Sequence, residues 1–320
     1  MNDFPKISII TPSYNQGQYI EQTITSILNQ NYDNVELIII DGGSTDNTVE
    51  VIKKFENRIA YWVSEKDKGQ ADAINKGLNI ATGDIFNWIN SDDYLMPNSL
   101  LEIGNFFKNN PNKNMFCGFT RCFFDEDKGT SHEYRMGVKD NEVDTIVNVE
   151  MNQPGSFYRL NAVKEIGGVN ESLRYVFDDE LWFRYLCIYG IESIGFTEKR
   201  LAEFRLHKKS KSVDEGFNLF AQELQSLYID IAENAEAPKW LIDEMEKVNY
   251  SDKYIPTKKW NLKCLNKEKF IAAFASKYIN TLYLRGEKSL AKQALQMVIK
   301  NGYYKWNRIM ISLRLKLLFK

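Results

Sequence analysis

The chain has 320 residues, of which 43% are apolar, 26% charged and 13% aromatic, and its formal net charge is −2. This apolar fraction supports a folded core and excludes wholesale disorder, while 18 glycines and 7 prolines exclude a collagen-like chain. The length indicates two domains, or one large domain with an appendage.

Targeting and redox signals are weak in this sequence. No stretch approaches the roughly 18 consecutive apolar residues of a membrane-spanning helix, and the N-terminus lacks the basic start and apolar run of a signal peptide. We therefore expect a cytoplasmic protein. The four cysteines form no CxxC pair, and the only histidines are His132 and His207, so neither a disulfide framework nor a zinc ribbon nor a histidine-rich metal site is supported.

The charge is unevenly distributed along the chain. Residues 216–320 hold 18 basic and 10 acidic side chains, which leaves 23 basic and 33 acidic ones in residues 1–215. A basic tail on an acidic body suggests an anionic partner for the tail, and an acidic body does not favour nucleic acid. We expect one domain over residues 1–215 and a mainly helical region over residues 216–320.

The first hundred residues alternate between predicted strands and predicted helices. Such alternation predicts an α/β fold with a mostly parallel sheet and helices on both faces. The predicted strands are residues 6–11, 35–40, 59–63 and 85–89. Apolar residues at helical spacing between the strands are Ile20, Ile24, Ile27 and Leu28, then Val51, Ile52 and Phe55 after a cap at Ser44 or Thr45, then Ile74, Leu78 and Ala81.

The rest of the chain reads as mixed and then as helical. A helix is predicted to begin near Asp178, and the pattern after residue 216 is mainly helical. The last eighteen residues interleave apolar and basic side chains, as an interfacial helix or a packing helix would.

Three carboxylates fall at the carboxyl ends of predicted strands: Asp41, Asp92 and Asp93. Ligands bind beyond these ends in such sheets, so the pattern puts the three on one rim. The adjacent pair Asp92–Asp93 is costly unless a cation or hydrogen-bond donors compensate it. A divalent ion held by one or two carboxylates and by phosphate oxygens is usual for nucleotide substrates. The alternative is a solvated turn that caps a helix starting near Pro97.

Other segments are candidates for the same site. Residues 41–46 (DGGSTD) follow a strand and open a helix, which suits an anion, although they form neither a GxGxxG fingerprint nor a Walker A loop. Residues 69–75 (GQADAIN) enter a helix through a small polar loop. Residues 178–180 put three acids at a helix start, where complementing the helix dipole is the alternative role. His207 alone is more often a surface or packing residue than a ligand.

Taken together, these motifs resemble the family 2 glycosyltransferases, which have the GT-A fold. The resemblance covers residues 5–212, about two thirds of the chain, and it rests on the order and spacing of the motifs rather than on any one of them. The matching segments are 7–15 (ISIITPSYN), 41–46 (DGGSTD), 69–75 (GQADAIN), 81–84 (ATGD), 90–93 (NSDD), 153–154 (QP), 167–168 (GG), 178–182 (DDELW) and 205–210 (RLHKKS).

The resemblance implies a nucleotide pocket with two walls. One wall would hold the base and the ribose, and the other would be the loop that enters the third helix. The residues concerned are Thr11, Pro12, Ser13, Tyr14 and Asp41 for the first wall and Gly69, Gln70 and Ala73 for the second.

The resemblance also implies the chemical groups of the site. Asp92 would lie near the ribose, and Asp93 would be the ligand of Mn²⁺ or Mg²⁺, with His207 able to reach the metal or the diphosphate. Asp178 would be the general base of an inverting reaction. Because the family often has Glu-Asp or Asp-x-Asp before Leu-Trp, Asp179 stays as the alternative base.

The implied activity is metal-assisted transfer of a sugar, of hexosyltransferase type, from a nucleoside diphosphate sugar to a hydroxyl group. We expect a UDP-sugar as donor and a glycan or a lipid-linked sugar as acceptor, as in members that build bacterial polysaccharides. Many members work at the cytoplasmic membrane face, so residues 303–320 are a candidate for peripheral membrane contact, with intramolecular packing or a homodimer contact as alternatives.

Two other functions stay open. The first is a sugar nucleotidyltransferase, which usually needs a basic Gly-rich loop near the N-terminus, whereas residues 11–17 contain no Lys or Arg. The second is a non-catalytic protein that binds a carbohydrate or a nucleotide, against which the presence of Asp41, Asp93 and Asp178 argues.

Overall fold

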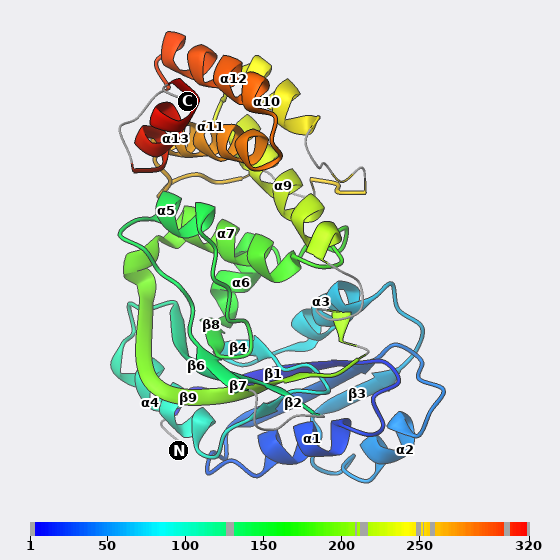
Figure 1. Ribbon diagram of the computed structural model, residues 1–320. Coiled ribbons are helices and arrows are strands. Elements are labelled where there is room, and N and C mark those ends of the chain that lie inside the picture. The colour runs from blue at the N-terminus through cyan, green and yellow to red at the C-terminus, as the bar shows by residue number, and fades with distance from the viewer. Residues whose placement is uncertain are drawn as a thin grey trace.

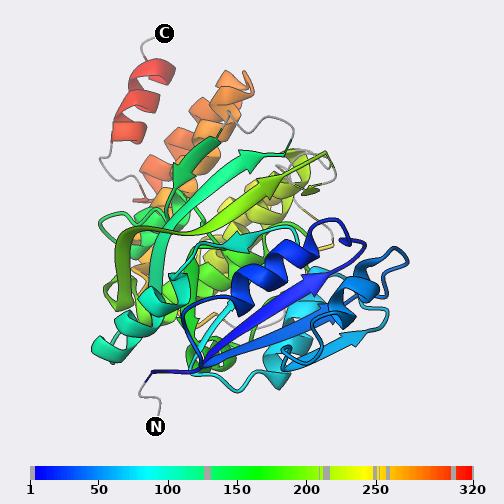
Figure 2. The ribbon, with the colours of Figure 1, turned by 90° about the horizontal axis from the view of Figure 1, so that it is seen from below.

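The computed structural model describes residues 4–125, 131–208, 210–211, 217–247, 251, 253–256, 260–303 and 308–318. It is an α/β structure with a mixed sheet, helices on both faces of the sheet, and further helices from the C-terminal third stacked beyond one of these helical layers (Figure 1; Figure 2 shows the sheet from below). The expected fold class with its C-terminal helical region is therefore confirmed. None of the helices in the described ranges is both long enough and apolar enough to cross a bilayer.

The N-terminal part follows the predicted alternation. Every residue of the first and fourth strands is buried, as expected for strands that helices cover on both faces. The elements are β1 (Ile7–Ser13), α1 (Ile20–Leu28), β2 (Val35–Asp41), α2 (Thr48–Lys53), β3 (Tyr61–Ser64), α3 (Gln70–Ile80) and β4 (Ile85–Trp88).

The start of α2 differs from the predicted one. The helix begins at Thr48, so a cap at Ser44 or Thr45 is wrong. The Thr48 N–H donates to Asp46 Oδ1 at 3.0 Å, so the Asp46 carboxylate accepts a hydrogen bond from the first residue of the helix. The Ser44 hydroxyl is used elsewhere, because it donates to Asp41 Oδ1 at 2.5 Å. The Ser44 hydroxyl also accepts from the Asn15 N–H at 2.7 Å, so both of its hydrogen bonds lie away from the start of α2.

The middle of the chain contributes the second half of the sheet. The helix predicted near Asp178 is α7, which begins one residue earlier, at Phe177. The elements are β5 (Tyr94–Leu95), α4 (Ser99–Asn109), β6 (Met115–Phe124), β7 (Ser131–Tyr134), α5 (Glu142–Val147), β8 (Ser156–Arg159), α6 (Leu160–Ile166), α7 (Phe177–Tyr189), η1 (Ile191–Ser193) and β9 (Ile194–Leu206).

The C-terminal third is helical within the described residues, as predicted. Its elements are α9 (Phe217–Asn234), α10 (Lys239–Glu246), α11 (Lys267–Leu284), α12 (Lys288–Lys300) and α13 (Arg308–Leu318).

The strand order is β3-β2-β1-β4-β8-β6-β9-β5, with β7 beside β6. Pairing is parallel from β3 to β4 and again between β6 and β9, whereas β8 runs antiparallel to both of its neighbours and β5 and β7 are antiparallel to theirs. The part of the sheet from β3 to β4 is therefore parallel, and the part from β4 to β5 is mixed. Strands that follow one another directly, as β6 and β7 do, can pair antiparallel without a crossover helix.

Two apolar cores lie on the two faces of the sheet. The smaller core packs α1, α2 and α4 against one face. The larger core packs α3, α6 and α7 against the other face and continues without a break into the C-terminal helices, from Trp88 and Trp182 to Leu227, Phe274 and Leu295. The sheet with its covering helices and the C-terminal helices therefore share one core.

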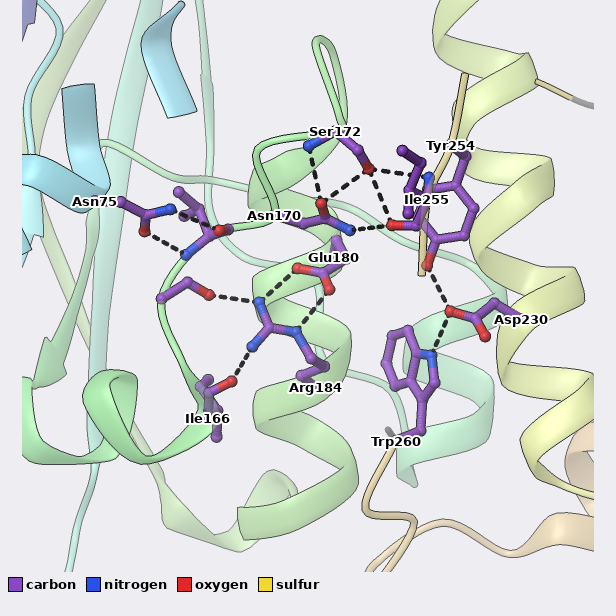
Figure 3. Close-up of polar contacts among 12 residues, drawn as sticks. Asn75, Ile166, Asn170, Ser172, Glu180, Arg184, Asp230, Tyr254, Ile255 and Trp260 are labelled. Atoms are coloured by element: carbon purple, nitrogen blue, oxygen red, sulfur yellow. Dashed lines mark hydrogen bonds and ion pairs between the residues drawn. The ribbon is translucent and has the colours of Figure 1, made fainter. Parts of the chain in front are cut away.

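Polar contacts also join the C-terminal third to the loop before α7 (Figure 3). The Asn170 side chain donates to the carbonyl oxygen of Ile255 at 3.3 Å. Asp230 of α9 accepts hydrogen bonds from the Tyr254 hydroxyl at 2.5 Å and from Trp260 Nε1 at 2.7 Å. These bonds hold the segment between α10 and α11 against both α9 and the loop that leads into α7.

Candidate active site

The carboxyl ends of β1, β2 and β4 meet at one edge of the sheet. Ser13 lies beside Asp41 in the β1–β2 pair, and Ile10 lies beside Trp88 in the β1–β4 pair. The register therefore brings the end of β2 and the turn at residues 89–93 to the same edge, on either side of β1. This is the rim on which the sequence pattern puts three carboxylates.

Two hydroxyl groups at the end of β1 are buried without a hydrogen-bond partner among the described residues. They belong to Thr11, which is fully buried, and Ser13, which is 5% exposed. Buried hydroxyls normally have a partner, so these two are available to a ligand or an ordered water. Pro12 between them is buried, and Tyr14 next to them is 60% exposed. The end of β1 thus offers two unused hydroxyls and an exposed ring.

The carboxylate of Asp41 is buried and held by its own turn. Oδ2 accepts hydrogen bonds from the N–H groups of Gly43 (3.2 Å) and Ser44 (2.9 Å) and from the Ser64 hydroxyl (2.6 Å). The Asn15 N–H donates to the Ser44 hydroxyl at 2.7 Å, which ties the loop after β1 to the loop after β2. A base or ribose would reach Asp41 only by exchanging with one of these donors.

Gln70, the first residue of α3, connects this helix with the turn after β4. Its Nε2 donates to Asn90 Oδ1 at 2.7 Å, and its Oε1 accepts from Lys211 Nζ at 2.9 Å. Gly69 has a φ of 117° and open space where a Cβ would stand, so a ligand can approach its backbone. Ala73 is only 2% exposed and packs in the larger core, so it is part of the core rather than of an open wall.

Asp93 is fully buried. Its Oδ1 accepts from the Arg205 N–H at 2.9 Å, and its Oδ2 accepts from Asn90 Nδ2 at 3.1 Å. Burial, and then the neighbouring charge of Asp92, raise the pKa of Asp93 well above its usual range. Both oxygens of this enclosed carboxyl group are bonded to the protein, so the group supports the turn.

Asp92 has a different environment from its neighbour. Its side chain is 18% exposed, and Oδ2 lies 3.1 Å from His207 Nε2, whose side chain is 9% exposed. The His207 ring packs against Tyr19, with 5.0 Å between the ring centroids. The pair therefore presents one carboxylate oxygen and one imidazole nitrogen side by side near the surface.

Arg205 fixes this pair from behind. Its Nε donates to the carbonyl oxygen of Asp92 at 3.0 Å, and its guanidinium also donates to Gln22 Oε1 at 2.6 Å and pairs with Asp125. Asp125 in turn accepts from the Tyr19 hydroxyl at 3.2 Å. Since Arg205 itself is 7% exposed, these bonds hold the turn after β4 against the ends of β6 and β9.

Asp178 and Asp179 lie in the first turn of α7 and are half-buried. Burial raises the pKa of Asp178 to about 6. The backbone N–H groups of the first helical turn and the Lys211 ammonium act in the opposite direction and lower this pKa. Burial and the charge of Asp178 raise the pKa of Asp179 well above its usual range, and Asp179 Oδ1 has no hydrogen-bond partner among the described residues. Asp178 is thus the carboxylate of the two that ionises more readily.

The ion pair Glu180–Arg184 anchors the same helix (Figure 3). Arg184 donates to both carboxylate oxygens of Glu180, at 2.7 and 2.6 Å, to the carbonyl of Gly168 at 2.5 Å, and to the carbonyl of Ile166. Both charged side chains are almost completely buried. The third acid of the motif is therefore structural, and it is not available for chemistry.

Two site residues, Tyr134 and Lys211, have no counterpart among the expected ones. Burial raises the pKa of Tyr134, and the charges of Cys122, Asp93 and Asp178 raise it further, so this side chain on β7 interacts electrostatically with both acids. Lys211 bonds to Gln70 and acts on Asp178. Tyr134 lies in a segment without any motif, and Lys211 is one of several lysines in its segment, so neither carries a sequence signal.

Asp92 and His207 fit a divalent cation together with a phosphorylated ligand. Their two donor atoms are of kinds that Mn²⁺ accepts, and a hard cation commonly takes one or two protein ligands and completes its shell with phosphate oxygens. In the part of the chain that the structure describes, no group of three or more His, Cys, Asp or Glu side chains is arranged to hold a metal. A cation here would depend on the ligand's own oxygens.

Comparison with known proteins decides the family. The family model described as glycosyl transferase family 2 matches residues 8–167, half of the chain. The chain belongs to glycosyl transferase family 2. The matched range includes the ends of β1, β2 and β4 and the turn with Asp92, whereas α7 and the end of β9 lie beyond it.

Relatives of this family 2 chain share part of their length with it. An uncharacterised glycosyltransferase of Rickettsia typhi is 28% identical over 211 residues, which cover 63% of this chain and 64% of that protein. The glycosyltransferase GlyG of Streptococcus pneumoniae is 37% identical over 97 residues, 29% of this chain and 32% of that protein. The chain thus spans less than two thirds of the length of these relatives.

Solved structures share the fold over almost the whole chain. The structure of S. aureus TarS, residues 1–349 in complex with UDP-GlcNAc, matches this chain with a TM-score of 0.56 at 16% identity. The matched region covers 98% of this chain and 88% of the TarS chain. The structure of the mannosyltransferase PcManGT of Pyrobaculum calidifontis, in complex with GDP-Man and Mn²⁺, matches with a TM-score of 0.52 at 16% identity. The matched region covers 99% of this chain and 88% of the PcManGT chain. At this identity the likeness concerns the fold, which is of the GT-A type.

Proposed function

We propose that this family 2 chain is an inverting, metal-assisted glycosyltransferase that moves a sugar from a nucleoside diphosphate sugar to a hydroxyl of a glycan or a lipid-linked acceptor. One observation supports the proposal: Lys211, whose charge acts on Asp178, is hydrogen-bonded to Gln70. Gln70 is in turn bonded to Asn90, and Asn90 to Asp93, in the turn after β4. Carboxyl groups from distant parts of the chain therefore converge on one region, as transfer to a hydroxyl requires.

The donor would bind between the ends of β1 and β2 and the start of α3. The unused hydroxyls of Thr11 and Ser13, with Asp41 behind them, suit a base and a ribose. We take a UDP-sugar as the first expectation and a GDP-sugar as the second, because TarS holds UDP-GlcNAc and PcManGT holds GDP-Man.

The diphosphate would lie against Asp92 and His207. We propose these two, and not Asp93, as the ligands of Mn²⁺ or Mg²⁺, because Asp93 is enclosed and both of its oxygens are bonded, while Asp92 and His207 are partly accessible and 3.1 Å apart. Such a cation neutralises the charge of the diphosphate and of the leaving group. Lys211, which bonds to Gln70, would add a positive charge on the α3 side.

Asp178 would act as the base. The acceptor oxygen attacks the anomeric carbon and its proton passes to an Asp178 oxygen, while the bond from the anomeric carbon to the phosphate oxygen breaks and its electron pair stays on the diphosphate. Attack from the face opposite the leaving group inverts the anomeric configuration. A positioned base of this kind contributes about 10²- to 10⁴-fold.

The test is the variant Asp178→Asn, with Asp179→Asn beside it. Nucleotide sugars are first screened for thermal stabilisation in Mn²⁺, and release of the nucleoside diphosphate is then measured with the best donor. We expect Asp178→Asn to bind the donor normally and to lose transfer by at least a hundredfold, and Asp179→Asn to lose far less. Normal transfer by Asp178→Asn would remove this residue from the base role.

The same assay separates the other two functions. A sugar nucleotidyltransferase would release pyrophosphate from a nucleoside triphosphate and a sugar phosphate, and a binding protein would be stabilised by the donor without consuming it. We expect neither result. A nucleotidyltransferase usually needs a basic loop that residues 11–17 do not provide, and the carboxyl group of Asp178, whose pKa burial raises to about 6, suits proton transfer rather than passive binding.

We propose residues 1–215 as the transferase domain and residues 216–320 as the region for acceptor, membrane or dimer contacts. The segment 303–320 lies partly outside the described residues; within them α13 packs Leu317 inward and leaves Ile311 and Leu315 exposed. Co-sedimentation with anionic liposomes, with and without residues 303–320, tests the membrane contact, and sedimentation velocity tests the homodimer. Equal pelleting of both forms would end the membrane proposal.

A further inference from the structure

A carboxylate from the C-terminal region holds the backbone that leads into α7. Glu223 of α9 accepts three backbone hydrogen bonds: Oε1 from the N–H of Arg174 at 2.9 Å, and Oε2 from the N–H groups of Tyr175 at 2.7 Å and Val176 at 3.2 Å. Glu223 is only 7% exposed. Charge-assisted bonds to backbone N–H groups are short and strong, so three of them define the path of this segment.

The segment that Glu223 holds is the N-terminal cap of α7. Val176 is the N-cap residue, and its carbonyl oxygen accepts the first helical hydrogen bond, from the Glu180 N–H at 2.9 Å. The same residue's N–H donates to Glu223, so Val176 is fixed on both sides. Asp178 follows two residues later.

A ring contact adds to this carboxylate clamp. Phe220, one turn before Glu223 on α9, packs on the ring of Tyr175 with 4.9 Å between the centroids. The first turns of α9 therefore hold the cap of α7 through both a carboxylate and a ring. Each contact joins the C-terminal region to the residues immediately before Asp178.

We propose that Glu223 is a positioning residue for sugar transfer, which fixes the cap of α7 and through it the carboxylate of Asp178. This inference rests on the proposed role of Asp178 as the base. It gives the C-terminal region a part in the reaction that does not depend on any acceptor, membrane or dimer contact.

Glu223 also acts on Asp178 through its charge. Among the described residues, the groups that interact electrostatically with Asp178 include Asp179 on α7, Lys211 after β9, Glu223 on α9, Tyr134 on β7 and Tyr158 on β8. Lys211 stabilises the ionised form of Asp178 and Glu223 opposes it. Loss of the Glu223 charge should therefore move the acidic limb of the pH–rate profile to lower pH.

The first experiment compares Glu223→Ala and Glu223→Gln with the control Glu233→Gln, which removes a charge from an exposed position of the same helix. We expect Glu223→Ala to lower kcat by about ten- to a hundredfold, to leave the donor KM within about twofold, and to shift the acidic limb downward. Glu223→Gln keeps one acceptor oxygen and should show the same shift with a smaller loss of kcat. An unchanged kcat and limb in both Glu223 variants would overturn the inference.

The second experiment combines Glu223→Ala with Asp178→Asn. If Glu223 acts through Asp178, the double variant retains the residual activity of Asp178→Asn alone. If the two losses multiply, Glu223 only supports the fold and the inference is overturned. Full activity of Asp178→Asn would instead overturn the base assignment and this inference with it, so the assay distinguishes the two failures. Circular dichroism confirms that each variant is folded.

Discussion

A carboxyl group that ionises near neutrality is the main residue-level feature of this site. Burial raises the pKa of Asp178 to about 6, while the first turn of α7 and Lys211 keep it from rising further. A base whose pKa lies near the working pH combines a large ionised fraction with the ability to accept a proton. If Asp178 is the base, as proposed, the balance among these neighbours sets the pH range in which the chain can act.

We expect kcat to fall as the pH drops through about 6, because protonated Asp178 cannot accept the acceptor's proton. Below that value the rate should fall about tenfold per pH unit, and above it the rate should level off. The measurement is the pH dependence of nucleoside diphosphate release at saturating donor. A flat profile between pH 5 and pH 7.5 would contradict a titrating base.

The same raised pKa has the opposite consequence for stability. The folded chain holds the Asp178 proton more tightly than the unfolded chain does, so this group's contribution to stability is full below its ordinary pKa and is lost as pH rises through about 6. Asp178→Asn should therefore raise the free energy of unfolding at pH 7.5 by about 1–3 kcal/mol and leave it unchanged at pH 4. Urea unfolding at the two pH values measures this, and equal shifts would point to a different cause.

The two adjacent acids of the turn should behave differently on substitution. Asp92→Asn should remove the Mn²⁺-dependent part of UDP affinity and leave the fold intact, as calorimetry with and without Mn²⁺ would show. Asp93→Ala leaves the Arg205 N–H without an acceptor and should cost about 1–3 kcal/mol of stability. Asp93→Asn keeps an acceptor and should cost less. Equal loss of Mn²⁺-dependent affinity in Asp92→Asn and Asp93→Asn would contradict the division of roles.

At the residue level, the sequence predicts which acids gather but not what each one does. The doublet Asp92–Asp93 stands out as a motif, yet its division into an accessible and an enclosed carboxyl group depends on Arg205, 112 positions away. The role of Glu223 could not be predicted from the sequence for a related reason. Glu223 lies next to the apolar residues Leu224 and Leu227 of its helix, and the apolar periodicity gives no information about a charged residue among them.

At the level of elements, α7 is fixed by a buried ion pair rather than by its apolar pattern. Arg184 and Glu180 are 5% and 3% exposed, and the guanidinium also holds two carbonyl oxygens of the turn that ends α6. Since the first turn of α7 carries Asp178, this pair connects the stability of the helix with the position of the proposed base.

Arg184→Ala should therefore be strongly destabilising, by about 3–5 kcal/mol, because it leaves the Glu180 charge buried and unpaired. Lys199→Ala is the matched control, since it removes a cation from the exposed pair with Glu102 and should cost less than about 1 kcal/mol. Urea unfolding measures both. Similar losses in the two variants would show that burial of the Glu180–Arg184 pair does not matter.

Elements were predictable where the pattern is local and regular. The first four strands and three helices follow from β-branched runs and helical spacing, and they lie within a few residues of the predicted limits. The antiparallel half of the sheet was not predictable in this way. Its strands pair through residues such as Met115 and Tyr158, which are far apart in the chain. A run of apolar residues predicts a strand but does not indicate which other strand it pairs with.

At the level of the whole molecule, one apolar core joins the transferase part to the C-terminal helices. Phe183 of α7 packs on Tyr228 of α9 with 5.9 Å between ring centroids, and both rings are almost completely buried. Composition and charge favour a boundary near residue 215. The apolar core nevertheless continues across this boundary.

We accordingly expect a single cooperative unfolding transition. Far-UV circular dichroism and tryptophan fluorescence of the unaltered chain should report the same Tm within about 2 °C, because one core includes both the sheet and the C-terminal helices. Heating monitored by both signals provides the measurement. Two well-separated transitions would show instead that the halves unfold independently.

The distance along the chain between Asp92 and His207 has a consequence for biosynthesis. The two side chains stand 115 positions apart and meet only when β9 has been added to the sheet beside β6. A nascent chain that has not yet emerged beyond β9 holds just one half of the proposed cation site. If Asp92 and His207 hold the cation as proposed, donor cleavage can begin only after synthesis has passed this strand.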